Sequence, residues 1–578
     1  MIRSRSLTLL SLFCLLPLLL TSLAQAAPRY VDSPPLLRVI DTPVGEVQAG
    51  PLQLPVITWG GDIATIHANG DARTTASGSL FAQAGLDLRL VREDIFSEQV
   101  KAYLAGRSPF LRGTLGMINM AAERLAADPR TQPVILYQHT WSAGGDALVV
   151  KPGIHSATDL RGKTIALQAY GPHVEYMTKV LADAGLSGSD VTLRWLPDLT
   201  GSANTPMAAL YEEDVDAAFV IIPDALALTS NGTVGTGAED SIKGARILLS
   251  TKTANRIIAD VYAVRADWFA ANRDQAERLV QGLLQGQQAL AELMRARESQ
   301  GAEYRKMVTA AAEMLFDSAQ AVADVEGLYS DAEFVGYNGN REFFANPNYP
   351  RNLDRLTREA QSAFQGIGLM SAAVALKPAG WDYDRLRSAL SSATVAPAGM
   401  AGRFDQAEVA SVVARRQQQG TLGEGELFSF EIFFQPNQND FSPDLYRDSF
   451  ERVVDLASTY GGAIITVEGH SDPMGYLREK NQGSAEVVLG RIKQSARNLS
   501  LSRAVAVRDS LVGFATTQGV ALDPSQFAVI GHGISAPKSG VCGSDPCAPK
   551  SEREWRDNMR VVFRIVQIEA ESSLFRPL

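Results

Sequence analysis

Short apolar runs alternate with longer amphipathic segments along the first two thirds of the chain. Runs rich in β-branched and aromatic residues, bounded by Gly, Pro, Asn or Asp, predict strands. Apolar residues that recur every three or four positions predict helices. The predicted strands are 52–59, 86–93, 133–140, 145–152, 191–196 and 215–222, with a capped turn into a strand at 157–168, and the predicted helices are 96–106, 173–186 and most of 268–330. This alternation predicts an α/β architecture with mainly parallel sheets.

The pattern changes near residue 391 and resumes near residue 426. Residues 391–425 are rich in Ser, Ala, Pro and Gly around one short helical piece, which predicts a linker. A second, smaller α/β domain is therefore expected over 426–570, after a first region over 50–390. Its predicted strands are 428–434, 464–468, 527–531 and 560–567, and its predicted helices are 444–458 and 499–518.

The composition is that of a globular protein with two to four domains. Of the 578 residues, 46% are hydrophobic and 20% are charged, and the formal net charge is −10. The chain has no basic stripe and no row of interleaved aromatic residues. We therefore do not expect nucleic acid as a partner.

The N-terminus has the pattern of a secretory signal peptide. Arg3 and Arg5 precede the apolar run 7–20, and Ala24-Gln25-Ala26 forms a small-residue cleavage site. The run is too short for a permanent membrane span, and Cys14 lies inside it, which is a poor position for lipidation. We expect a signal peptide over 1–26, export to the periplasm, and an exposed lead-in over 27–50.

Two cysteines remain after the predicted cleavage. Cys542 and Cys547 lie close together in a loop rich in Gly and Pro. In an oxidising compartment such a pair predicts a small disulfide. A zinc site is the weaker alternative, because His532 is the one further candidate ligand nearby and zinc would be under-coordinated. We therefore expect a disulfide and no metal.

Three short motifs stand in order in the last 110 residues. They are Gly469-His470-Ser471-Asp472, the hexapeptide LSLSRA at 499–504, and Asn558-Met559-Arg560-Val561. Together they resemble the OmpA-like peptidoglycan-binding domain, whose hallmarks are a GH(T/S)D turn, an LSxxRA helix and an NxRV strand.

This resemblance implies a clamp for the zwitterionic end of the peptide-stem diamino acid. Asp472 would take the ammonium group and Arg503, in about the first turn of a helix, the carboxylate, for which a guanidinium offers a matching fork of donors. Asn558 and Arg560 would belong to the same peptidoglycan site. Asp472 and Arg503 lie about twice as far apart as in the family, so about 477–497 resembles an inserted segment, and Asn481 could serve as the family's Asn only if this segment loops out.

The first region resembles a second family, the type 2 periplasmic solute-binding proteins of the nitrate, sulfonate and thiamine-precursor kind. The matching stretches are Ile57-Thr58-Trp59, Asp159-Leu160-Arg161-Gly162-Lys163, Ala184-Gly185-Leu186 and Val215-Asp216-Ala217-Ala218. The resemblance implies two α/β lobes that hold a small molecule between them, with an ABC transporter permease as a potential partner. The expected fold is thus a two-lobed periplasmic-binding-protein fold followed by an OmpA-like α/β sandwich.

Candidate ligand contacts lie at the predicted ends of strands and starts of helices in this region. Trp59 offers a stacking face, and Asp62 or Asp146 a partner for an amine. The small residues 168–171 deliver backbone N–H groups at a helix start, which favours anionic groups. The full set is Trp59, Asp62, Thr114, Ser142, Gly145, Asp146, Gln168, Gly171 and Asp260.

Two other functions compete with solute binding. One branch of the second family makes a thiamine pyrimidine with a cysteine-rich segment, but this chain has no Cys between residues 15 and 541. His67, His139 and His173 have neither a nucleophile nor metal-ligand spacing beside them. The third hypothesis is a spacer whose N-terminal region has lost its ligand. We expect no enzymatic activity and no cofactor.

Overall fold

The computed structural model describes residues 27–238, 240–388, 390, 406–420, 426–434 and 446–566. The predicted signal peptide 1–26 lies outside these residues, as does most of the predicted linker. The helical piece expected within the linker is α16 (Gln406–Gln419). The domain boundaries stay predictions.

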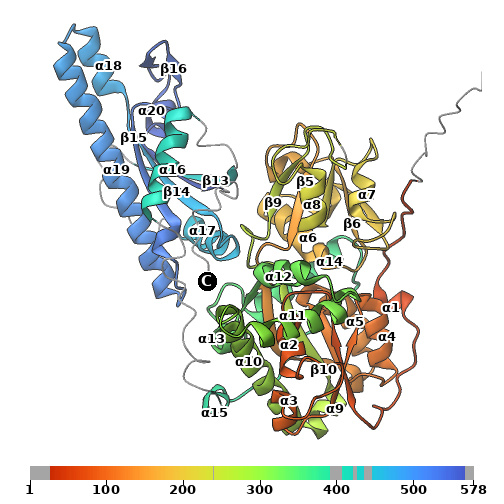
Figure 1. Cartoon of the computed structure of the whole chain (residues 1–578). Coiled ribbons are helices and arrows are strands. Elements are labelled where there is room, and N and C mark those ends of the chain that lie inside the picture. The colour runs from red at the N-terminus through yellow and green to blue at the C-terminus, as the bar shows by residue number, and fades with distance from the viewer. Residues whose placement is uncertain are drawn as a thin grey trace, which may run out of the picture.

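A first group of strands lies in the lower part of Figure 1, among the helices drawn in red, orange and green. Strands β1 (Leu52–Val56) and β2 (Leu88–Arg92) pair in parallel. A five-stranded sheet runs in the order β11 (Ala332–Phe334), β4 (Pro133–Ser142), β10 (Ala259–Arg265) and β3 (Phe110–Thr114), with β12 (Lys377–Pro378) beside β4. The helices of this part are α1 (Leu36–Val39), α2 (Asp62–Ala68), α3 (Leu80–Gln83), α4 (Phe96–Leu104), α5 (Leu115–Ala126), α9 (Ala266–Ala271), α10 (Arg273–Arg295), α11 (Gly301–Phe316), α12 (Val322–Asp331), α13 (Gly336–Ala345), α14 (Leu353–Gly366) and α15 (Tyr383–Ser388).

A second five-stranded sheet lies above the first and is drawn mainly in yellow (Figure 1). Its order is β7 (Thr192–Leu196), β6 (Thr164–Gln168), β8 (Ala217–Ile221), β5 (Asp146–Val150) and β9 (Arg246–Ser250). Its helices are α6 (His173–Asp183), α7 (Pro206–Leu210) and α8 (Ile222–Leu228).

The chain crosses between the two sheets at two adjacent connections. Residues 143–145 join β4 to β5, and residues 251–258 return from β9 to β10. Because the returning strand runs opposite to the outgoing one, β10 pairs antiparallel with β4, and β9 pairs antiparallel with β5. The prediction of mainly parallel sheets is therefore wrong: both sheets are mixed.

The N-terminal segment 27–50 is not the exposed lead-in that its prolines suggested. Leu36 and Ile40 are buried, and the Arg124 guanidinium donates to the Ile40 carbonyl over 2.7 Å. The Val31 amide donates to the Trp195 carbonyl of β7 over 2.9 Å. The segment thus packs along both sheet regions.

The C-terminal part contains a four-stranded sheet drawn in cyan and blue (Figure 1). Its order is β13 (Glu426–Phe433), β18 (Arg560–Val566), β14 (Ile464–His470) and β15 (Phe527–Gly533), with β14 and β15 parallel and the other pairs antiparallel. Its helices are α17 (Arg447–Thr459), α18 (Met474–Asn481), α19 (Glu486–Thr517) and α20 (Glu552–Asp557).

The segment 477–497 does not loop out as an irregular insertion. It completes α18 and forms the first third of α19. Residues 486–498 contain no proline, and their good helix formers, among them Leu489, Arg491 and Lys493, outweigh Gly490, so the helix extends in the N-terminal direction from the predicted start at 499. Tyr476 and Leu489 are buried together with Ile534, which packs the two helices against the core.

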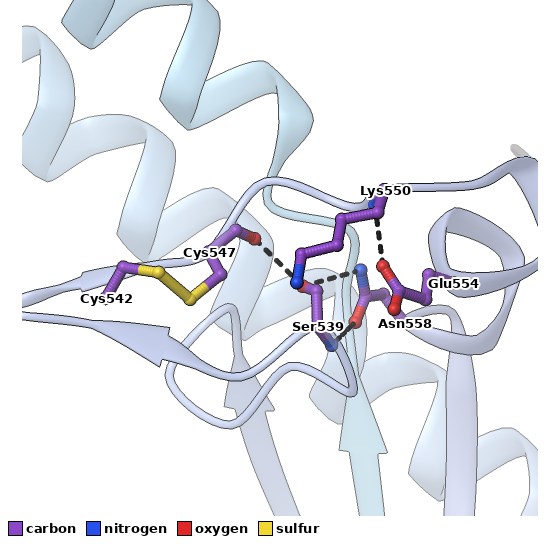
Figure 2. The surroundings of a disulfide bond; sticks show 6 residues. All are labelled: Ser539, Cys542, Cys547, Lys550, Glu554 and Asn558. Carbon is purple, nitrogen blue, oxygen red and sulfur yellow. Dashed lines mark hydrogen bonds between the residues drawn. A yellow bond between two sulfur atoms is a disulfide. The ribbon is translucent and has the colours of Figure 1, made fainter.

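The predicted disulfide joins Cys542 and Cys547 (Figure 2). It closes a hairpin of β16 (Val541–Cys542) and β17 (Asp545–Pro546). Ser539 connects this hairpin to the start of β18: its hydroxyl donates to the Cys547 carbonyl over 2.9 Å, and its amide donates to Asn558 Oδ1 over 3.3 Å.

None of the described helices combines the length and the apolar character needed to cross a membrane.

Candidate functional site

A buried ion triad lies at the ends of the strands in the first sheet region. The Arg112 guanidinium, on β3, donates to both oxygens of Asp62 over 3.2 and 2.8 Å and to Asp260 Oδ1 over 2.8 Å. Arg112 and Asp62 are fully buried, and Asp260 is 3% exposed. The triad ties the start of α2 to β3 and β10.

The triad changes the interpretation of Asp62 and Asp260 as ligand contacts. Burial raises the pKa of Asp62 to about 7, although Arg112 lowers it. Burial also raises the pKa of Asp260, against the same guanidinium. Both carboxylates are already paired with the Arg112 guanidinium. Arg112 therefore stands where we expected Asp62 to bind the amine of a ligand.

Trp59 extends this network toward the connection between the sheets. Its indole Nε1 donates to Thr140 Oγ1 over 2.9 Å, and Thr140 Oγ1 donates to Asp260 Oδ2 over 3.0 Å. A Cβ atom on Gly145 would lie 2.5 Å from the Trp59 ring. Trp59 therefore lies against the first connection, where the absence of a side chain at Gly145 makes room for the indole.

A second network joins the two connections between the sheets. Thr251 Oγ1 accepts the amide hydrogens of Gly144 and Asp146, each over 3.1 Å. The Ser142 hydroxyl donates to Asp146 Oδ2 over 2.6 Å and lies 2.9 Å from Thr251 Oγ1. His173 Nε2, at the start of α6, lies 2.7 Å from Asp146 Oδ1. The structure thus brings together Ser142, Gly145 and Asp146.

The other predicted contacts have local structural roles. Thr114 Oγ1 accepts the Met117 amide hydrogen and caps α5. Gln168 ends β6, and its side chain lies against Gly171, where a Cβ atom would meet Gln168 Oε1 at 2.3 Å.

Sequence reasoning missed three acidic or basic residues at this junction. Glu175, on α6, lies against Gly116 of α5, and burial raises its pKa to about 8, although Arg351 lowers it. Burial and the nearby charge of Asp146 raise the pKa of Asp331 to about 6. A signal for Arg112 was available, because an arginine inside the apolar strand 109–115 needs a buried partner.

The three histidines considered as catalytic bases are engaged or shielded. His67 Nδ1 lies 3.0 Å from Asp71 Oδ1 in the turn that follows α2. His139 is fully buried, and burial holds its pKa well below the ordinary value, with the charge of Arg112 acting in the same direction.

In the C-terminal domain, three of the four predicted clamp residues carry a buried polar atom without a hydrogen-bond partner among the described residues. These atoms are Asp472 Oδ1, Arg503 Nε and Arg560 Nη1. Burial raises the pKa of Asp472, although hydrogen bonds from Trp555 and the Met474 amide and the charge of Arg478 lower it, and burial lowers the pKa of Arg503.

The sheet topology brings these residues to one end of the domain. Asp472 follows the end of β14, and Arg560 begins the antiparallel neighbour β18. The Arg503 guanidinium lies over the Phe434 ring, 5.5 Å from its centre, and the Phe434 amide donates to the carbonyl of Met559. Arg560 Nε donates to Glu431 Oε1 over 3.2 Å, which leaves Nη1 unpaired.

Arg503 lies in the middle of α19, not in its first turn as expected. The helix packs closely on the sheet at this level, because a Cβ atom on Gly469 would lie 1.9 Å from the Ser500 carbonyl. The Ser500 hydroxyl also accepts the Gly533 amide hydrogen over 2.9 Å. Gly469 and Ser500, which belong to two of the three motifs, therefore fix the distance between the sheet and the helix that carries Arg503.

Asn558, the fourth predicted clamp residue, is fully buried and bonded to Ser539. Figure 2 shows its side chain between the start of β18 and the disulfide hairpin. In this position it orients the hairpin.

Glu468, His470 and His532 form the one group of potential metal ligands found in the described part of the chain. The two imidazole rings stack with centres 4.7 Å apart and planes 13° apart. A metal lies near the plane of each ligating imidazole, and stacked parallel rings do not share such a point. Glu468 also accepts from Arg564 over 3.0 Å. The arrangement is that of a packed polar cluster.

Removal of the central guanidinium should destabilise the first sheet region strongly. Arg112→Leu leaves Asp62 and Asp260 buried without a cation, for which we expect a loss of about 3–5 kcal/mol in the free energy of unfolding. Urea denaturation followed by circular dichroism measures it. Arg73→Leu, which removes an exposed arginine 3.9 Å from the exposed Asp317, is the matched control and should cost less than about 1 kcal/mol. Equal losses would contradict a structural role of the triad.

Glu175→Gln should flatten the pH dependence of stability. Folded Glu175, with its raised pKa of about 8, retains a proton that the unfolded chain releases above about pH 4.3, so stability falls as pH rises through this window. The slope from this one group is at most about 1.36 kcal/mol per pH unit. Denaturation at pH 5 and pH 8 tests it, with the exposed Glu98→Gln as control, and an unchanged slope in Glu175→Gln would refute the assignment.

Comparisons with known proteins bear on the N-terminal region. Residues 76–293 match a family described as NMT1/THI5 like. No curated protein sequence matches the chain.

Several solved structures are similar at low identity. The periplasmic aliphatic sulphonate binding protein SsuA from Escherichia coli is 16% identical over 57% of this chain and 90% of its own, with a TM-score of 0.38. The periplasmic nitrate-binding protein NrtA from Synechocystis PCC 6803 is 14% identical over 60% and 89%, also with a TM-score of 0.38. The desulfurization enzyme DSZB is 18% identical over 59% and 99%, with a TM-score of 0.34. The family match shows that residues 76–293 are similar to NMT1/THI5 like proteins.

Proposed function

We propose that this protein is a periplasmic solute-binding protein that its C-terminal domain holds on peptidoglycan. The observation that carries the first half is the NMT1/THI5 like match over 76–293, a range that spans both sheets and both connections between them. In a two-lobed binding protein the ligand lies between the lobes, and movement at the connections encloses it.

The junction between the sheets offers the groups for such a ligand. Trp59 supplies an aromatic face, and Ser142, Asp146 and His173 supply polar atoms from both sheet regions. These groups come from different elements on the two sides of the connections. An ABC transporter permease is the partner that this function implies.

The first test is native mass spectrometry of the mature chain, secreted with its own leader and purified from periplasm. We expect a bound small molecule that is lost in Asp146→Ala, because Asp146 links Ser142 to His173. Asp274→Ala, an exposed carboxylate on α10, is the control and should retain the mass. An apo mass that stays unchanged after addition of sulfonates, nitrate, phosphate and pyrimidines would favour the spacer function instead.

The second half of the proposal rests on the unpaired atoms at the end of the C-terminal sheet. A buried polar atom without a partner costs free energy, which a ligand that supplies the partner recovers. Asp472 and Arg503 carry opposite charges, and a diamino acid offers an ammonium and a carboxylate to match them. Arg503 would form charge-assisted hydrogen bonds with that carboxylate, and its guanidinium fork favours a bidentate pair.

Peptidoglycan binding is tested by co-sedimentation with purified cell wall. Arg503→Ala and Asp472→Ala should each weaken binding at least about 30-fold, equivalent to about 2 kcal/mol. Arg508→Ala, on the same helix and paired with Asp509, is the matched control and should bind normally. Normal sedimentation of both folded clamp variants would refute the site.

A further inference from the structure

The C-terminal domain contacts the second connection between the two sheets through backbone atoms. The Gly462 amide donates to the Thr253 carbonyl over 3.1 Å, and the Arg256 amide donates to the Thr459 carbonyl over 3.2 Å. Thr253 and Thr459 are fully buried, and Arg256 is 6% exposed. The end of α17 and the turn after it are therefore bonded to the connection 251–258 through the backbone of both segments.

This contact requires a residue without a side chain. A Cβ atom on Gly462 would lie 1.9 Å from the Lys252 carbonyl oxygen, far inside van der Waals distance. The φ of Gly462 lies outside the left-handed region, so its own turn does not demand glycine. The close approach of this turn to the connection 251–258 is what demands glycine at position 462.

Helix α17 also binds the second sheet region. The Tyr460 hydroxyl donates to Asp183 Oδ2 over 2.8 Å, and the Arg452 guanidinium donates to the Asp183 carbonyl over 2.9 Å. Lys179 Nζ lies 3.2 Å from Asp455 Oδ2. Both partners, Lys179 and Asp183, lie on α6, the helix whose first residue is bonded to Asp146.

Asp455 contacts a second element as well. Arg355 of α14 lies 3.2 Å from Asp455 Oδ1, and α14 packs against both α5 and α6. Burial alone would raise the pKa of Asp455, but Lys179, Arg351 and Arg355 outweigh it and hold the pKa below its ordinary value. The carboxylate is therefore a charged link between α17 and the helices that border both sheets.

The C-terminal domain contacts the second connection, 251–258, and Thr251 bonds this connection to the first one, 143–145. Thr251 accepts the amide hydrogens of Gly144 and Asp146 in the first connection, and Thr253, two residues later, accepts from Gly462. A short run of hydrogen bonds thus links the C-terminal domain to both connections at once.

The candidate peptidoglycan site lies at the other end of the same strand. Gly462 precedes β14 and Asp472 follows it, so the seven residues of β14 separate them by about 20 Å. Docking on the connections leaves the Asp472 end free to bind.

We propose that the C-terminal domain controls the connections between the two sheets. In the docked state it fixes residues 251–256 and so restrains movement of one sheet against the other, and movement of the sheets in turn weakens docking. Such coupling is reciprocal by thermodynamic necessity. It goes beyond the proposed function, because it concerns the chain alone and holds for any ligand of the N-terminal region.

Hydrogen–deuterium exchange of the whole mature chain without ligand tests this coupling. In Gly462→Ala the added Cβ displaces the Lys252 carbonyl. We expect protection to fall about tenfold or more at 253–256 and 459–462, and also at 143–146, which the C-terminal domain does not bond directly. Gly513→Ala, which adds a Cβ in open space on α19, is the matched control and should change these segments less than about twofold.

A second variant guards against misfolding of the first. Asp455→Asn removes the charge that faces Lys179 and Arg355 and leaves the core of the C-terminal domain intact. If exchange at β14 and β15 shows that Gly462→Ala unfolds the C-terminal domain, the test of the coupling is exchange at 253–256 and 143–146 in Asp455→Asn. Loss of protection at 253–256 with unchanged protection at 143–146 would overturn the coupling, and unchanged protection at both segments would overturn docking itself. Because no ligand is added, these results are independent of whether a solute binds.

Discussion

The N-terminal region depends on the burial of one guanidinium between two carboxylates. Arg112, Asp62 and Asp260 would each be costly to bury alone, so β3, the start of α2 and β10 must meet in one register for any of them to be accommodated. Once they do, Asp260 positions Thr140, and Thr140 positions Trp59 against Gly145. Trp59 is therefore placed by a structural ion triad whose charges are already paired with one another.

The connections between the sheets are built from small residues for a related reason. Gly144, Gly145 and Thr251 allow backbone groups to approach closely and to bond through one hydroxyl. Gly462 lets a separate domain approach the same place. The connections between the two sheets are thereby accessible to the C-terminal domain, which larger side chains at these positions would block.

The two ends of β14 have different neighbours. At its start, Gly462 and Tyr460 are bonded to Thr253 and Asp183, although Thr459 Oγ1 has no hydrogen-bond partner among the described residues. At its end, Asp472, Arg503 and Arg560 each keep an unpaired buried atom among these residues. The proposed cell-wall site therefore rests on the opposite charges of Asp472 and Arg503 at one end of the sheet, and not on unpaired atoms alone.

The sequence by itself determined what depends on neighbouring residues: most strands and helices, the close cysteine pair that forms the disulfide, and the order of the three C-terminal motifs. It failed where a partner is distant. Arg112 lies 50 residues from Asp62 and 148 from Asp260, and the need for glycine at position 462 comes from Lys252. Only the tertiary structure decided which carboxylates are already paired and how far α19 extends, because the pairing of a side chain depends on strand register and packing between segments that local patterns do not relate.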